Sequence, residues 1–233
     1  DVAPSRGLGD VYKRQDICVP RASYVANAFT NYLSMINFHD KNIKVNYRET
    51  NSFDTIKDVY EGEANIGIIR FPIDEESYFL HLLETKELNF EKLYQFNYQL
   101  LFSNENPLSF KEIIYLSDLE TQIEITHGDT ALPSLPIVAT NRNDETRHSK
   151  KEISVYERAS QFELLNHLPH TFMWVSPIPQ EVLRRFNLVT KECQENKMSY
   201  QDLLITRKGY RLSKEDEGFI RAIKCSCLLY TSD

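Results

Sequence analysis

Several features of common protein classes are missing from this sequence of 233 residues. No apolar run approaches the roughly 20 residues that a membrane-spanning helix needs, and no signal peptide is visible. With only seven glycines and no repeat, the chain also has no low-complexity segment or flexible linker. We therefore expect a globular chain that does not contact a membrane.

The motifs of common enzyme and metal sites are missing as well. The sequence contains no G-x-S-x-G, H-E-x-x-H, P-loop or G-x-G-x-x-G segment, and no cysteine pair has the C-x-x-C spacing. No metal-ligand spacing is found among His39, His81, His148, His167 and His170. The net charge of -7, without any cluster of Lys and Arg, leaves no surface for a phosphate backbone. We expect no enzyme activity, no bound metal or cofactor, and no direct binding to DNA.

The two ends of the chain look foreign to the protein. Residues 5–15 read SRGLGDVYKRQ and residues 227–232 read CLLYTS, and neither stretch has apolar periodicity. One DNA spelling of residues 10–15 is GAT GTG TAT AAG AGA CAG, and its reverse complement, read from the second base, encodes Cys-Leu-Leu-Tyr-Thr. Because unrelated protein ends would rarely be the two strands of one oligonucleotide, residues 1–15 and 227–233 resemble translated sequencing-library adapter. Residues 16–226 are then expected to be an open-ended fragment.

Residues 16–226 are long enough for one large domain or for two small lobes with buried cores. They contain three cysteines, Cys18, Cys193 and Cys225, and an odd number suggests a reducing compartment rather than a disulfide framework. We therefore expect a cytoplasmic protein in which Cys18, in an apolar run, is inert packing.

The first third of the chain alternates between strand and helix patterns. Short apolar or alternating runs at 16–19, 43–47 and 65–69 predict strands. Between them lie two helical patterns, one that Ser23 can cap and one that Asn51 or Ser52 can cap and Gly62 ends. This order predicts a parallel sheet with helices on its faces.

The remainder repeats the alternation. Strands are predicted at 94–103, 123–126, 153–156, 172–175 and 200–206, and helices at 113–119 (or a turn), 161–168, 179–186 and after Ser213. Trp174, in the apolar strand at 172–175, is expected to be core. Two α/β lobes in one chain are the natural interpretation, and such lobes bind ligands in the cleft between them.

Three segments resemble the regulatory (effector-binding) domain of LysR-type transcription regulators. They are ICVPRASY at 17–24, NIGIIR at 65–70 after a Gly-Glu turn, and NENPL at 104–108 after the strand YQLLF. Asn65 stands where the family's G-x-x-D-x-x-I segment has Asp, and Asn106 replaces the His of its H-P-L segment. HGDTALPSLPI and MWVSPIPQEVL resemble a Firmicutes-like subgroup.

The resemblance implies a two-lobed α/β fold like that of type 2 periplasmic binding proteins, with mixed, mostly parallel sheets and an effector cleft between the lobes. The first lobe would take residues 16–93 and 200–226, and the second residues 94–199. The family also has an N-terminal winged helix-turn-helix, which is missing here. The resemblance thus implies a small-molecule effector, a homodimer or homotetramer formed through regulatory domains, and DNA contact only through the missing domain.

In that family the effector lies against strand ends and helix N-termini. The matching positions are Arg21, Ala22, Ser23, Thr50, Asn51, Ser52 and Arg70 in the first lobe, and Thr126, His127, Gly128, Asp129, Thr130, Val175, Ser176 and Pro177 in the second. Helix N-termini offer N–H groups and partial positive charge, and an arginine can bind a carboxylate with two hydrogen bonds. We therefore expect an anionic effector, held by Arg21 or Arg70.

Some of these residues also have a purely structural interpretation. Ser23 and Ser52 can be plain helix caps, and Arg70 can pair with Asp74 or Glu75 on the surface. For the chain as a whole, a solute-binding protein of a transport system shares the fold class. An enzyme on the same two-lobed scaffold is a less favoured alternative.

Overall fold

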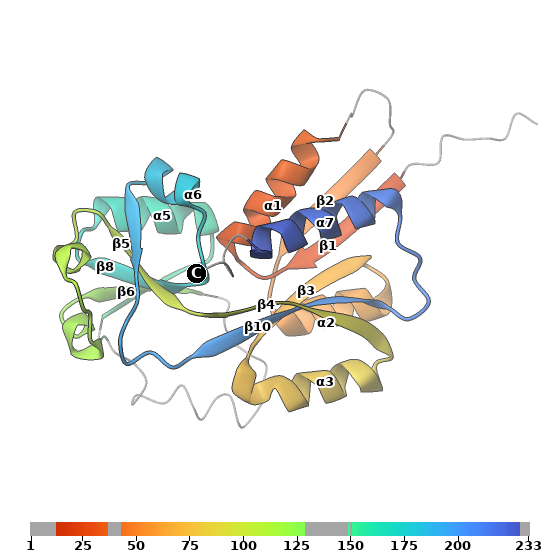
Figure 1. The fold of residues 1–233 in the computed structure, drawn as a ribbon, viewed down its shortest axis with the longest axis horizontal. Coiled ribbons are helices and arrows are strands. Elements are labelled where there is room, and N and C mark those ends of the chain that lie inside the picture. Colours follow the sequence, from red (N-terminus) through yellow and green to blue (C-terminus); the bar gives the residue numbers. More distant parts are fainter. Residues whose placement is uncertain (1–12, 37–42, 129–148, 150, 229–233) are drawn as a thin grey trace, which may run out of the picture.

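Two five-stranded sheets organise the chain, which the computed structural model describes at residues 13–36, 43–128, 149 and 151–228. The sheets lie at opposite ends of the molecule, each with its own helices (Figure 1). We call the half built on the first sheet lobe 1 and the half built on the second sheet lobe 2.

Lobe 1 has the strand order β2-β1-β3-β10-β4. Strand β1 (Lys13–Val19) pairs in parallel with β2 (Ile43–Glu49) and β3 (Ile66–Pro72), while β10 (Ser199–Arg207) runs antiparallel between β3 and β4 (Leu88–Asn97). One face is covered by α1 (Ser23–Ser34) and α7 (Lys214–Leu228), the other by α2 (Ser52–Glu61) and α3 (Glu76–Thr85), which follows the 3-10 turn η2 (Ile73–Glu75). The predicted parallel pairing of the first three strands, with helices on both faces of the sheet, is confirmed, and β10 and β4 add an antiparallel part.

The strands of lobe 1 are apolar on both faces because helices cover both. Ile17 and Val19 pack under α1 and α7, while Cys18 between them packs under α2. Gly67 brings α2 especially close, since a Cβ there would lie 2.6 Å from the Thr55 methyl group and 2.8 Å from a side-chain carbon of Ile205.

Lobe 2 has the strand order β7-β6-β8-β5-β9. Strand β6 (Ile123–His127) pairs in parallel with β7 (Glu152–Val155) and β8 (Thr171–Val175), and β5 (Gln99–Ser103) runs antiparallel to β8 and β9 (Leu188–Lys191). One face packs on α5 (Arg158–His167) and α6 (Gln180–Arg185), the other on the 3-10 turns η3 (Pro107–Phe110) and η4 (Leu116–Leu119).

Two connections join the lobes at one place, which we call the hinge. Strand β4 passes into β5 at Tyr98, and the chain returns from β9 to β10 through residues 192–198. The rings of Tyr98 and Tyr200 stack with centroids 4.1 Å apart, and Asn196 Nδ2 donates a hydrogen bond of 2.7 Å to the carbonyl of Tyr98. The two connections are therefore fastened to each other.

The hinge corrects one prediction. The stretch at 94–103 is two strands rather than one, because the chain leaves the first sheet after Asn97 and enters the second at Gln99. The sheet of lobe 1 thus extends past residue 93, where we expected that lobe to end. Helix α3 and strand β9 were not predicted at all. The N-cap of α3 makes no side-chain hydrogen bond, and β9 is only four residues long.

Two of the three helix caps predicted from the sequence are found in the structure. The prediction that Ser23 caps α1 is wrong, since Ala22 holds the N-cap position and Ser23 is the first helical residue. In α2 the cap is Asn51, whose side chain accepts a hydrogen bond from the Asp54 N–H. Ser213 precedes α7 as predicted, and its hydroxyl accepts a 3.1 Å hydrogen bond from the Asp216 N–H.

Regular structure extends beyond residues 16–226. Strand β1 begins at Lys13 and α7 ends at Leu228. Gln15 donates a 3.1 Å hydrogen bond to Asp216, and Cys227 on α7 is buried in the core of lobe 1. Because a strand grows by backbone pairing, as residues 13–15 do with 43–45, foreign residues can lengthen a strand that already belongs to the sheet. The adapter origin of the ends stays a prediction.

Candidate functional site

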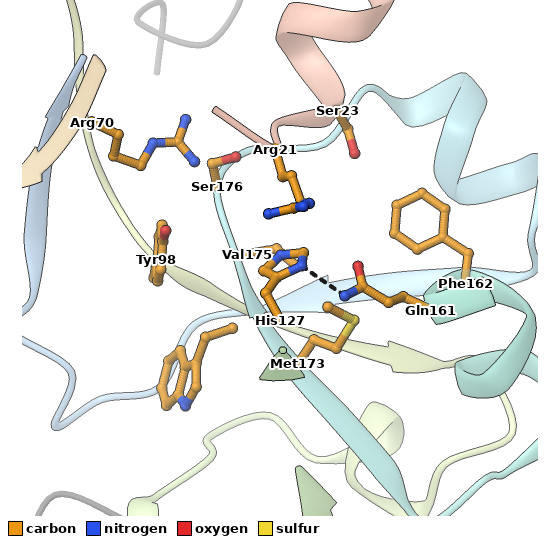
Figure 2. Close-up of a pocket in the computed structure, with 11 residues that line it drawn as sticks. Arg21, Ser23, Arg70, Tyr98, His127, Gln161, Phe162, Met173, Val175 and Ser176 are labelled. Carbon is orange, nitrogen blue, oxygen red and sulfur yellow. Dashed lines mark hydrogen bonds between the residues drawn. The ribbon is translucent and has the colours of Figure 1, made fainter. Parts of the chain in front are cut away.

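A pocket lies between the two lobes (Figure 2). Its lining comes from lobe 1, the hinge and lobe 2: Arg21, Ser23, Arg70, Tyr98, His127, Gln161, Phe162, Met173, Trp174, Val175 and Ser176. The empty volume among these side chains is about 360 Å³, part of it open to solvent. A molecule in this pocket would contact both lobes at once.

The strands explain why these residues meet. Arg21 follows β1, and Arg70 lies within β3, so both come from the parallel part of the first sheet. His127 ends β6, and Val175 ends β8, which are parallel neighbours in the second sheet. The carboxyl ends of parallel strands share one edge, and in this fold the two such edges face each other.

Basic side chains line the pocket. Arg21, Arg70 and His127 are its ionisable basic groups, and no Asp or Glu is among the lining residues that the structure describes. Helix α1 also begins at this edge, and its first turn contains no acidic residue. The electrostatic character of the lining therefore favours an anion.

Arg70 is held by a buried carboxylate behind the pocket. Its Nε and Nη2 atoms donate hydrogen bonds of 2.8 and 2.7 Å to the two oxygens of Asp202, which is fully buried. The Tyr24 hydroxyl donates to the same carboxylate, and the Arg70 guanidinium lies 4.6 Å from the ring centroid of Phe96. Burial disfavours the charge, but Asp202 outweighs it and holds the pKa of Arg70 above its ordinary value.

The alternative pairing of Arg70 with Asp74 or Glu75 is wrong for this reason. Asp202 lies directly opposite Arg70 in the antiparallel ladder between β3 and β10, although 132 residues separate them in sequence. Arg21 is the second arginine of the pocket. Figure 2 shows its side chain pointing from the start of α1 toward the ring of His127.

His127 makes a short contact with a buried amide. Gln161, on α5, is 1% exposed, and its side-chain nitrogen lies 2.7 Å from His127 Nδ1 (Figure 2). The same nitrogen lies 3.4 Å from the carbonyl oxygen of Val155. The contact with Gln161 therefore fixes the orientation of the His127 ring.

The predicted site residues divide into three groups. The pocket is lined by Arg21, Ser23, Arg70, His127, Val175 and Ser176. The residues outside its lining are Ala22, Thr50, Asn51, Ser52, Thr126, Gly128 and Pro177. Asp129 and Thr130 lie outside the described residues. Contact between any of them and an effector stays a prediction.

Several predicted residues that do not line the pocket have structural roles instead. Asn51 caps α2, and the Ser52 hydroxyl donates a 2.6 Å hydrogen bond to the Arg70 carbonyl. The Thr126 hydroxyl donates to Glu152 on the neighbouring strand at 2.7 Å.

Five lining residues were not predicted: Tyr98, Gln161, Phe162, Met173 and Trp174. Trp174 packs partly against the core of lobe 2, as expected, but it also lines the pocket. Gln161 carries a signal that sequence reasoning could have used. It lies four residues before the buried Leu165, so helical spacing places this polar side chain on the inner face of α5.

No family model and no curated protein sequence matches this chain. Solved structures, by contrast, do match this chain. The regulatory domain of CcmR from Synechocystis PCC6803, in complex with 2-PG, superimposes with a TM-score of 0.62 at 14% identity, over 91% of this chain and 96% of that one. The effector-binding domain of QuiR, in complex with shikimate, gives 0.58 at 15% identity, over 94% and 99%. The regulatory domain of MetR, a LysR-family regulator from N. meningitidis, gives 0.57 at 12% identity, over 93% and 94%.

The chain has the fold of LysR-family regulatory domains. The predicted two-lobed α/β architecture, like that of type 2 periplasmic binding proteins, is thereby confirmed. Two of the similar structures, MetR and HinK from Pseudomonas aeruginosa, are named as LysR-family regulators. Within the part of the chain that the structure describes, no helix is long and apolar enough to span a membrane. Across the same residues, no three His, Cys, Asp or Glu side chains are grouped so that they could hold a metal ion.

Proposed function

We propose that this chain is the ligand-sensing regulatory domain of a bacterial, cytoplasmic LysR-type transcription regulator, and that it binds a small anionic effector between its lobes. The observation that carries the proposal is the pocket itself, which both lobes form and whose described lining residues include two arginines and a histidine but no carboxylate. Two structures of the same fold were solved in complex with small molecules, shikimate and 2-PG.

Arg21 is the group that we assign to the anion. The charge of Arg70 is already matched by Asp202, which takes two of its hydrogen bonds. Arg21 comes from the start of α1 and points into the space between the lobes (Figure 2). A hydrogen bond to a charged group contributes about 1.5–3 kcal/mol, so loss of the Arg21 side chain should weaken binding of an anion by tenfold or more.

An effector that contacts both lobes would bias the angle between them. The lobes are joined at the hinge, and the Asn27 side chain on α1 donates a hydrogen bond to Glu181 on α6 across the gap. A ligand shifts such an equilibrium only by its difference in affinity for the two arrangements. We propose that the shift changes the spacing of winged helix-turn-helix domains in a homodimer or homotetramer. DNA is then contacted only through those domains, which would precede this part of the full-length protein. We also propose that this regulator belongs to the Firmicutes-like subgroup of the family.

A thermal-shift screen tests the effector proposal. The chain is heated with small carboxylates, amino acids and sugar phosphates, each tested against the native sequence and against Arg21→Ala. A ligand at a hundred times its dissociation constant stabilises the folded state by about 2.7 kcal/mol, which is an easily measured shift.

Arg221→Ala is the matched control, because Arg221 lies on the solvent side of α7 and its side chain is 71% exposed. We expect an acid to stabilise the native chain and Arg221→Ala equally, and Arg21→Ala much less. If no anion stabilises the native chain, or if Arg21→Ala responds like Arg221→Ala, the anionic effector site proposed here is wrong.

A further inference from the structure

The hydrogen bond between Gln161 and His127 has a direction that the neighbouring atoms determine. The Gln161 amide group faces His127 Nδ1 at 2.7 Å and the Val155 carbonyl oxygen at 3.4 Å. A backbone carbonyl only accepts hydrogen bonds, so the amide nitrogen, not the amide oxygen, belongs on this side. The reverse orientation would place two acceptors against each other beside a side chain that is 1% exposed.

It follows that Nδ1 of His127 accepts a hydrogen bond. A neutral imidazole has one donor and one acceptor nitrogen, so the proton is then on Nε2. His127 lines the pocket and Arg21 points toward its ring (Figure 2). The polar end of the pocket therefore combines an Nε2–H donor with a guanidinium group.

Apolar side chains line the same pocket. Phe162, Met173 and Val175 are among them, and Phe162 and Met173 belong to the buried core of lobe 2. A bound molecule would thus meet hydrocarbon as well as hydrogen-bond donors. Inorganic phosphate or a sugar phosphate would leave the apolar side chains unmatched, whereas an organic acid with an apolar body would contact both.

We propose that Gln161 is a positioning residue that holds His127 in its Nε2–H form, so that the pocket selects organic acids with an apolar body and rejects ammonium groups. This inference rests on the proposed effector-binding function and names the ligand class of that site. The oxyanion would lie between Arg21 and His127, with the apolar body against Phe162 and Met173. An ammonium group would face donors and positive charge, with no carboxylate among the lining residues in the described part of the chain to compensate.

The tautomer is measured on the ligand-free chain by nitrogen-15 NMR of the histidine rings, at about pH 8.5, where an unperturbed histidine is neutral. His127→Gln identifies the His127 signals by their loss. We expect an unprotonated Nδ1 and a protonated Nε2. In Gln161→Glu the carboxylate can only accept, so the proton should move to Nδ1.

Gln95→Glu is the matched control for this variant, because it makes the same charge change at an exposed position of β4. It should leave the His127 signals as in the native chain. If the native ring is protonated on Nδ1, or if Gln161→Glu and Gln95→Glu give the same His127 signals, Gln161 does not position this ring. Should Gln161→Glu fail to fold, Gln161→Leu replaces it, with a mixture of both tautomers expected.

Ligand selection is measured separately, by the shift of His127 Nε2 on addition of benzoate, benzamide or benzylammonium at millimolar concentration. We expect benzoate alone to bind. His127→Gln can place an amide N–H near the Nε2 position, whereas His127→Asn is too short, so benzoate affinity should fall about tenfold or more only in the Asn variant.

The outcomes distinguish a failure of this inference from a failure of the proposed effector-binding function. Equal binding of benzoate and benzylammonium overturns the selection rule but not the pocket. Absence of binding by all three probes, with the tautomer as expected, overturns the ligand class and leaves the effector proposal to the wider screen. A native Nδ1–H ring overturns the inference whatever binds.

Discussion

The guanidinium of Arg70 and the carboxylate of Asp202 form a two-point ion pair across neighbouring antiparallel strands, with hydrogen bonds of 2.8 and 2.7 Å. The exposed fraction of the two side chains is 8% and 0%. Desolvation of two such charges is costly, and their attraction offsets this cost only while both partners are present. The pair therefore fixes one wall of the pocket, and it makes Arg70 a poor residue for testing ligand contact.

Removing one partner of this pair should lower the stability of the fold strongly. We expect Asp202→Ala to lower the free energy of unfolding by about 3–5 kcal/mol, because it leaves the Arg70 charge buried without compensation. Urea denaturation measures the loss. The double variant Arg70→Met with Asp202→Leu should recover part of it. A loss below about 1 kcal/mol in Asp202→Ala would show that water reaches Arg70 and that the pair is not desolvated.

Stability should fall in alkali. Burial raises the pKa of Tyr32 and Tyr94 to about 12, and burial together with Asp202 raises the pKa of Tyr24 as well. Unfolded tyrosine ionises near pH 10, whereas these folded groups keep their protons, so their contribution is complete below about pH 10 and is lost as the pH rises toward 12. Each contributes at most about 1.4 kcal/mol per pH unit, and less where water reaches the ring.

Urea midpoints measured between about pH 8 and pH 11 check this, since tyrosine is protonated at one limit and ionises in the unfolded chain at the other. Tyr94→Phe should flatten the fall, while Tyr156→Phe, at an exposed position, should not change it. An equal pH dependence in the native chain and Tyr94→Phe would rule out Tyr94 as a source.

The cysteines should differ in reactivity. Burial raises the pKa of the Cys18, Cys193 and Cys227 thiols, that of Cys227 to about 12, whereas Cys225 is exposed. Thiolate is the reactive species, so we expect one thiol to react quickly with a disulfide reagent at neutral pH and three to react only on unfolding. Cys225→Ser should abolish the fast phase. A second fast thiol in the native chain would contradict the burial of the other three.

A side chain at position 67 should destabilise the fold. Gly67→Ala places its methyl group 2.6 Å from a Thr55 carbon and 2.9 Å from a Val59 carbon, so α2 must move off the sheet. We expect a loss of about 1–3 kcal/mol in urea denaturation. Gly209→Ala is the control for the same chemical change, because no atom lies within 4 Å of its Cβ position and only its φ of +77° opposes alanine, at about 1–2 kcal/mol. The two variants should also differ in ligand binding, since only Gly67 lies in β3 beside Arg70.

Sequence patterns predicted most elements of this fold, because apolar strands and amphipathic helices carry their own signals. The parallel strands of lobe 1, the Asn51 cap and the position of Ser213 follow from residues close together in the chain. Elements with weak local signals were missed, such as β9, with four residues. The break at Tyr98 was missed because apolar residues continue on both sides, and only the separation into two sheets interrupts them.

The sequence by itself determined which residue types stand at or near the strand ends. It brought Arg21 and Arg70 into consideration as anion-binding groups, and the family resemblance added the position of His127. Tertiary structure alone decided what each of them does. Arg70 pairs with Asp202 because β10 returns from the far end of the chain to lie antiparallel beside β3, and His127 meets Gln161 because α5 packs against the sheet that β6 belongs to. Both contacts join residues that are far apart in sequence, and no local pattern encodes the distance between two side chains that only the packed fold brings together.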